Sequence, residues 1–276
     1  MYQLAFLKND AAEMARDVAW GSGKSGVEDA LIGMEADTAA YSGQLRRAED
    51  LTRQAVSSAV RADEKETAAY YEAQAGIRQA LFGNPEAAKR HAADALAMTD
   101  GRDVQYVAAL ALVFAGDANR VQALQNDFAK RFPEDTLVKF LYLPSVRAQQ
   151  AFLRRDYSKA VEELAPATPY EMGQANGGST ISIALYPVHI RAMALLAAKQ
   201  GKEAAAEYQK IVDHRSVVLN GPIGALVQLG LGRAYALAGE ATQAKIAYQD
   251  FLVRWKDADA DVPILKQAKE EYAKLQ

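Results

Sequence analysis

A helical hairpin pattern recurs along this chain, and its clearest copy covers residues 229–251. Gly232 and Ala244 are small residues in two successive amphipathic stretches, so two helix backbones can approach closely there, with Tyr248 filling the space between them. Gly239 separates the stretches, and glycine ends a helix in the left-handed conformation at little cost. The segment therefore predicts two short helices joined by a tight turn.

One position of this pattern can be followed through the whole chain. This anchor residue opens the second helix and is small in most copies. It recurs at intervals of 33 to 44 residues, at Met14, Ala48, Ala88, Val121, Ala160, Ala204 and Ala244. Four or five residues before the anchor, each copy has a turn that can end one helix and start the next. These turns begin at Asn9, Gly43, Gly83, Gly116, Arg155, Lys199 and Gly239.

The spacing of small and aromatic residues resembles the tetratricopeptide repeat over nearly the whole chain. The last copy matches the family's two small and two aromatic positions with Gly232, Tyr235, Ala244 and Tyr248, and Pro133 ends the fourth copy as the family's proline does. The family's tryptophan is absent from every copy. The resemblance implies an all-α fold, a right-handed α-α superhelix (a solenoid) of about seven helix pairs in one domain over residues 1–276.

Three segments depart from the repeat. Residues 1–22 supply only a short first helix, so we expect an incomplete first repeat and a chain cut from a longer protein. Residues 165–180 contain three glycines and two prolines, which predicts a long loop between repeats. Residues 261–276 have apolar residues on one helical face, which predicts a capping helix over the last repeat.

A second resemblance is carried by residues 229–275 and by the stretches TAAYSG, RADEKETAAYYEA, GRDVQY and RFPEDT. They resemble bacterial proteins, many of them acidobacterial, in which tetratricopeptide repeats follow a serine/threonine protein kinase domain or a winged-helix regulator. The resemblance implies a non-catalytic regulatory or sensory module of a larger signalling protein. The alternative is a fragment of such a kinase whose ATP-dependent protein phosphorylation lies outside this chain, since the chain has no H-R-D and no D-F-G motif.

Two short motifs suggest ligands, but other interpretations are favoured. Residues 21–25, GSGKS, resemble the end of a phosphate-binding loop, yet Val18 replaces the opening glycine and the preceding residues are helical in period, so we expect a turn between repeats. Asp257, Asp259 and Asp261 alternate as in a calcium loop but lack its glycine and glutamate. We expect these acidic residues to cap the last helix.

We expect no catalytic residues, no metal and no cofactor. The chain has no cysteine, and His91, His189 and His214 lie too far apart in sequence to form a local metal motif. No G-x-S-x-G motif is present. A hydrolase site in the 165–180 loop is the enzymatic alternative.

The charges favour a protein partner over nucleic acid. The 32 Lys and Arg residues are interleaved with 35 Asp and Glu residues, giving a net charge of −3 and no basic block. No apolar run is long enough for a membrane span, and acidic residues come too early for a signal peptide. We therefore expect no membrane insertion and a cytoplasmic location, although the absence of cysteine also fits an exported protein.

The partner is expected on the concave face of the superhelix, which the first helix of each pair lines in this family. In the register above, the inward positions carry Tyr70, Tyr106, Tyr142, Tyr186, His189 and Arg233. Such amphipathic side chains suit a peptide or partner protein, and the alternative is that several of them pack between repeats. The Lys and Asn set of chaperone-tail binders is not visible. Self-association through the incomplete first repeat is a further expectation.

Overall fold

The computed structural model describes residues 1–173 and 185–275. Over these residues the fold is helical and contains no strand, which confirms the all-α prediction. The elements are α1 (Tyr2–Lys8), α2 (Ala11–Gly21), α3 (Glu28–Tyr41), α4 (Leu45–Arg61), α5 (Lys65–Leu81), α6 (Pro85–Met98), α7 (Arg102–Phe114), α8 (Ala118–Arg131), η1 (Val138–Tyr142), α9 (Leu143–Leu153), α10 (Tyr157–Glu163), η2 (Ala165–Ala167), α11 (Tyr186–Ala197), α12 (Gly201–Asp213), α13 (Arg215–Val218), α14 (Pro222–Leu237), α15 (Ala241–Arg254) and α16 (Pro263–Ala273).

Successive helices pack in pairs: α1–α2, α3–α4, α5–α6, α7–α8, α9–α10, α11–α12 and α14–α15. The predicted turns lie at the breaks within these seven pairs. The first residue of every turn has a positive φ, at Asn9, Gly43, Gly83, Gly116, Arg155, Lys199 and Gly239. Glycine adopts this conformation without steric penalty, and the other three residues adopt it singly, as non-glycine residues do. The helical hairpins predicted from the turns are thus confirmed.

Three of the second helices begin with an aspartate cap. The carboxylates of Asp10, Asp117 and Asp156 each accept a hydrogen bond from the backbone N–H three residues further on. Such a cap satisfies one of the free N–H groups at a helix start. Local sequence therefore ends one helix and begins the next at these turns.

The first helices of the central pairs are buried around most of their circumference. Residues 104–113 of α7 are all buried, and so are residues 186–192 of α11. A helix that is apolar on every side needs neighbours on every side. The second helices α4, α8 and α12 are amphipathic and bury only one face.

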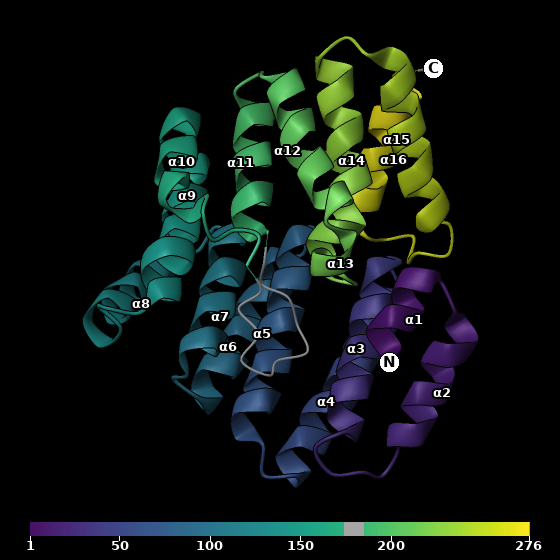
Figure 1. Cartoon of the computed structure of the whole chain (residues 1–276), viewed down its shortest axis with the longest axis vertical. Helices are drawn as coiled ribbons and strands as arrows, with labels where there is room; N and C mark the ends of the chain where they lie inside the picture. Colours follow the sequence, from purple (N-terminus) through teal and green to yellow (C-terminus); the bar gives the residue numbers. More distant parts are fainter. Residues whose placement is uncertain (174–184, 276) are drawn as a thin grey trace.

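The chain also turns back on itself, which adds contacts between helices that are far apart in the sequence. In Figure 1 it runs from α1–α4 at the lower right to α8–α10 at the left, and returns through α11–α15 above the first hairpins. Helix α14 contacts both α3 and α5, far away in sequence. The return therefore packs the C-terminal part of the chain against two of the first helices.

Trp255, just after α15, joins the two ends of the array. Its side chain is 1% exposed, and its indole Nε1 donates a hydrogen bond of 3.1 Å to the carbonyl of Tyr41 at the end of α3. Its ring meets Phe82 edge to face, with the ring centres 5.1 Å apart. The C-terminal hairpin is thus packed against the turns that end α3 and α5.

The acidic residues before α16 do not cap it, so that expectation is wrong. The N-cap of α16 is Val262, which makes no side-chain cap. Instead Asp259 accepts a hydrogen bond of 2.9 Å from the backbone N–H of Arg46, in the first turn of α4, and Asp261 pairs with the Arg46 guanidinium at 2.7 Å. The first turn of α4 has free N–H groups that attract carboxylates, and the fold brings Asp259 to one of them, while Asp261 binds the Arg46 side chain.

The structure also tests the other segments that were expected to depart from the repeat pattern. Helix α16 packs on α15 through buried Leu265 and Ala268, within the segment predicted to cap the last pair. Of the predicted 165–180 loop, residues 165–167 form η2, and residues 174–180 lie outside the described part of the chain. In the first hairpin Leu4 and Trp20 are exposed, and self-association there stays a prediction.

Candidate functional site

The four tyrosines predicted on the concave face are buried, so the expectation that they are open to a partner is corrected. Their exposed fractions are 8% for Tyr70, 1% for Tyr106 and Tyr142, and 3% for Tyr186. The rings of Tyr106 and Tyr142 stack 3.7 Å apart, and the Tyr142 hydroxyl donates to Asp103 at 2.7 Å. Neighbouring hairpins cover these rings, because Tyr142 stacks on Tyr106 of α7 and also lies against Phe128 of α8. This is the packing between repeats that the alternative expected.

His189 and Arg233, the other two predicted residues, do line a cavity. Its volume is about 520 Å³, and it lies among α5, α7, α9, α11, α12, α14 and α16; we call it the inner cavity. Its wall is mostly apolar and includes Phe114, Phe152, Met193, Leu196, Leu229 and Ile264. Sequence reasoning thus found two residues of the inner cavity and missed its apolar wall, because the wall comes from helices far apart in the chain.

Two buried polar groups on the wall of the inner cavity lack partners. His189 is 4% exposed and Gln149 is 2% exposed, and neither His189 Nδ1 nor Gln149 Oε1 has a hydrogen-bond partner within the described residues. Burial lowers the pKa of His189 to about 4, so its imidazole is neutral at pH 7. Unpaired buried polar groups are costly, and at a cavity they are available to a ligand.

The two cations at the inner cavity differ in their availability. Arg233 makes a bidentate ion pair with Glu271 of α16, at 2.8 and 2.9 Å, and the Tyr248 hydroxyl donates to the same carboxylate. Lys199, at the turn after α11, is exposed and forms no ion pair with the described carboxylates. Lys199 is therefore the cation that an acidic ligand group could reach.

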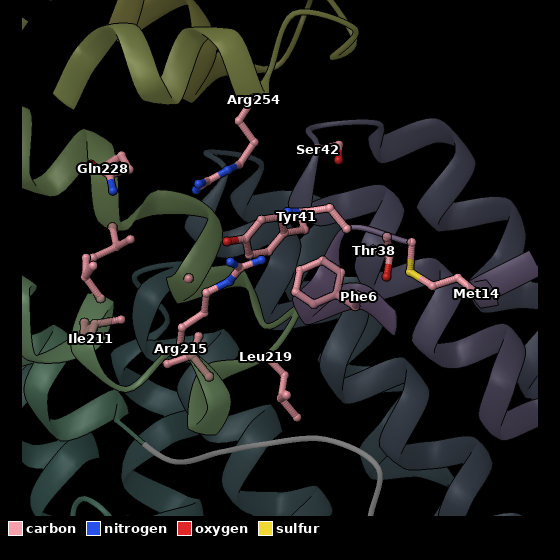
Figure 2. A pocket seen from close by; sticks show the side chains of 15 residues that line it. Phe6, Met14, Thr38, Tyr41, Ser42, Ile211, Arg215, Leu219, Gln228 and Arg254 are labelled. Atoms are coloured by element: carbon pink, nitrogen blue, oxygen red, sulfur yellow. The ribbon is translucent and has the colours of Figure 1, made fainter. Parts of the chain in front are cut away.

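A second cavity, the terminal cavity, lies between the two ends of the array. Its volume is about 480 Å³, and its lining comes from α1, α2 and α3 on one side and α12, α13, α14 and α15 on the other. Figure 2 shows Phe6 and Tyr41 in this cavity, with Arg215 and Arg254 directed toward them. Sequence reasoning missed this cavity, since no local motif links residues from such distant segments.

In the GSGKS turn, two groups that would bind a phosphate have other partners. The backbone N–H of Gly23 donates a hydrogen bond of 2.9 Å to the carboxylate of Glu28, and the Lys24 ammonium lies 3.4 Å from the centre of the Trp20 ring. The segment forms the connection between α2 and α3, as the turn interpretation expected. Among the described residues, no group of three His, Cys, Asp or Glu side chains is arranged to hold a metal ion.

Over the described residues, the structure defines a class: an all-helical array of hairpins, folded back on itself, whose cavities include the inner cavity and the terminal cavity. Comparisons with protein-family models, with curated proteins and with solved structures returned no match. No described helix is both long enough and apolar enough to cross a membrane.

Proposed function

We propose that this protein is a non-catalytic interaction scaffold that binds an apolar peptide segment of a partner protein in the inner cavity. The observation that carries the proposal is the pair of unpartnered buried groups, His189 Nδ1 and Gln149 Oε1, on a mostly apolar wall. A peptide inserts apolar side chains and also brings amide groups, which suit both features of this wall.

The size of the inner cavity supports this occupant. A volume of about 520 Å³ lies within the usual range of ligand sites. It accommodates a few side chains of a bound segment, and such buried anchors contribute most of the affinity at protein interfaces. Lys199 at the rim adds a preference for an acidic residue beside the apolar ones.

We also infer a tetratricopeptide-type, right-handed arrangement of the hairpins. Support comes from the close packing at the small positions of the repeat: a Cβ atom on Gly232 would come within 2.7 Å of the Tyr248 ring. The anchor residues Ala88, Val121, Ala160, Ala204 and Ala244 are all fully buried. By the resemblance described above, the scaffold serves as the regulatory part of a larger bacterial signalling protein.

A peptide selection tests the proposal. Peptides selected from a random library on the whole chain are titrated by fluorescence anisotropy against wild type and Met193→Glu. Met193 is half-buried on the cavity wall, so the added carboxylate opposes an apolar ligand there, and we expect Kd to rise at least about tenfold. The matched control is Ile246→Glu, because Ile246 is 53% exposed and lies outside the inner cavity; its Kd should stay within about twofold of wild type.

The selection can also contradict the proposal. Peptides that bind Met193→Glu and wild type equally would place the partner site elsewhere. Failure to select any peptide would argue against a peptide-binding scaffold. Circular dichroism of both variants shows that the helical fold is retained.

A further inference from the structure

We propose that the terminal cavity binds a small organic carboxylate with an apolar body. This site is separate from the inner cavity and lies between the N-terminal and C-terminal hairpins. The proposal rests on two arginines without acidic partners, on the apolar wall around them, and on the volume of the cavity.

The two arginines are held by aromatic rings. The Arg254 guanidinium lies 5.1 Å from the centre of the Tyr41 ring, and the Arg215 guanidinium lies 5.9 Å from the centre of the Phe6 ring. The Phe6 and Tyr41 rings meet edge to face, with their centres 5.0 Å apart. Figure 2 shows both guanidiniums reaching toward this ring pair from opposite elements, α15 and α13. A guanidinium over an aromatic ring is attracted to the ring face, and its N–H groups stay available to a ligand.

The positive charge of the terminal cavity is not compensated by the described protein. Its lining contains Arg215 and Arg254 but no Asp or Glu, and neither guanidinium forms an ion pair with a described carboxylate. The Nη1 atom of Arg254 is buried and has no hydrogen-bond partner in residues 1–173 or 185–275. Two cations facing one cavity repel each other, and a buried donor without an acceptor is costly. An anion in the cavity relieves both costs.

Among the neutral polar groups of the lining, the Thr38 hydroxyl is already fully hydrogen-bonded, and the two arginines are the charged groups that select the ligand. The Thr38 hydroxyl donates to the Met34 carbonyl at 3.0 Å and accepts hydrogen bonds from Tyr2 at 3.0 Å and Asn220 at 3.1 Å. A hydroxyl that donates once and accepts twice has no capacity left. A guanidinium matches the planar carboxylate with two parallel hydrogen bonds, so a carboxylate is the fitting group.

The rest of the cavity wall is largely apolar, which favours a ligand whose carboxylate is attached to an apolar body. Met14, Ile211, Val218 and Val227 line the cavity together with the two rings. Its volume of about 480 Å³ is in the range that holds a small organic molecule, and far more than a bare anion needs. A ligand with one carboxylate and an apolar body fills this space. Because it would contact both ends of the array, its binding should also stabilise the fold.

Calorimetric titration of the whole chain tests this site with four probes. 1-Naphthoate and decanoate carry the carboxylate on an aromatic and on an aliphatic body, whereas 1-naphthamide lacks the charge and inorganic phosphate lacks the body. We expect at least one acid to bind with Kd below about 1 mM and to raise the Tm, and we expect the amide and phosphate to bind at least about tenfold more weakly. The tighter acid shows which kind of body the wall prefers.

Variants locate the bound acid. Arg215→Gln and Arg254→Gln should each weaken acid binding at least about tenfold, whereas Arg53→Gln, an exposed arginine outside the cavity, should leave it unchanged. Arg215 is exposed, so its substitution tests the site even if Arg254→Gln fails to fold. The proposal is overturned if neither acid binds, if naphthamide binds as well as naphthoate, or if Arg215→Gln keeps wild-type affinity.

Discussion

At the residue scale, the inward tyrosines show how the surroundings decide the role of a side chain. A tyrosine at such a position suits a binding face when it is open and serves as core when it is covered. Here Tyr142 is covered: it stacks on Tyr106, contacts Phe128 and donates to Asp103. Burial, and next the charge of Asp103, raise the pKa of the Tyr142 hydroxyl far above its usual value, so it remains a donor at all ordinary pH values.

Replacing Tyr142 should therefore destabilise the protein. Tyr142→Ala removes a fully buried ring, and we expect a loss of about 3 to 5 kcal/mol in the free energy of unfolding. Tyr142→Phe removes only the hydrogen bond to Asp103 and should cost about 1 to 3 kcal/mol, since the carboxylate loses a donor. Urea denaturation measures both values. An unchanged midpoint for Tyr142→Ala would mean that the ring is exposed after all.

At the element scale, His91 ties three helices together. From α6, its Nδ1 lies 2.7 Å from the carboxylate of Glu72 on α5, and its Nε2 lies 3.2 Å from that of Glu49 on α4. Burial by itself would lower the pKa of His91, but the hydrogen bonds to Glu49 and Glu72 outweigh it and raise the pKa to about 9. The charged imidazole thus links the second hairpin to the third.

This link should make stability depend on pH above neutrality. The folded pKa of about 9 exceeds the ordinary value of 6.5, so the stabilisation is fully present below pH 6.5 and is lost as the pH rises through 9. We expect wild type to lose on the order of 2 kcal/mol more than His91→Gln between pH 6.5 and pH 9.5. Urea denaturation across this range measures the difference. Parallel pH profiles for the two proteins would contradict the charged state of His91.

At the scale of the whole molecule, contacts between the ends hold the array closed. Trp255 joins α3 and α5 to the C-terminal hairpin, and the backbone N–H of Asp259 donates to the Gly43 carbonyl at 3.1 Å. Without these contacts, each end would expose the apolar face that it now buries against the other. The terminal cavity also depends on this closure, since its wall comes from both ends.

Trp255→Ala should open this junction. It removes one of the largest fully buried side chains, and we expect a loss of about 3 to 5 kcal/mol, with faster hydrogen exchange at the ends of both α3 and α15. The matched control is Trp20→Ala, because Trp20 is 63% exposed and its loss should cost little. Faster exchange confined to α15 would show that the two ends are not coupled through Trp255.

The sequence by itself determined the local architecture. Each hairpin turn is encoded within a few residues, by a left-handed residue such as Gly239 and often by a following cap such as Asp117. Burial of the small anchor residues likewise follows from the helical period, as Ala244 illustrates. These features depend on short-range geometry, so they could be predicted from the chain alone.

Only the tertiary structure decided what those hairpins enclose. The return of α14 onto α3 and α5 accompanies the contact of Asp259 with the start of α4 and the placement of Arg215 and Arg254 against Phe6 and Tyr41. Each of these contacts joins residues about 200 positions apart in the sequence. The hairpin pattern carries no information about contacts between such distant residues. The path of the array is the sum of many small packing angles between hairpins, and such angles are set by side-chain contacts in three dimensions.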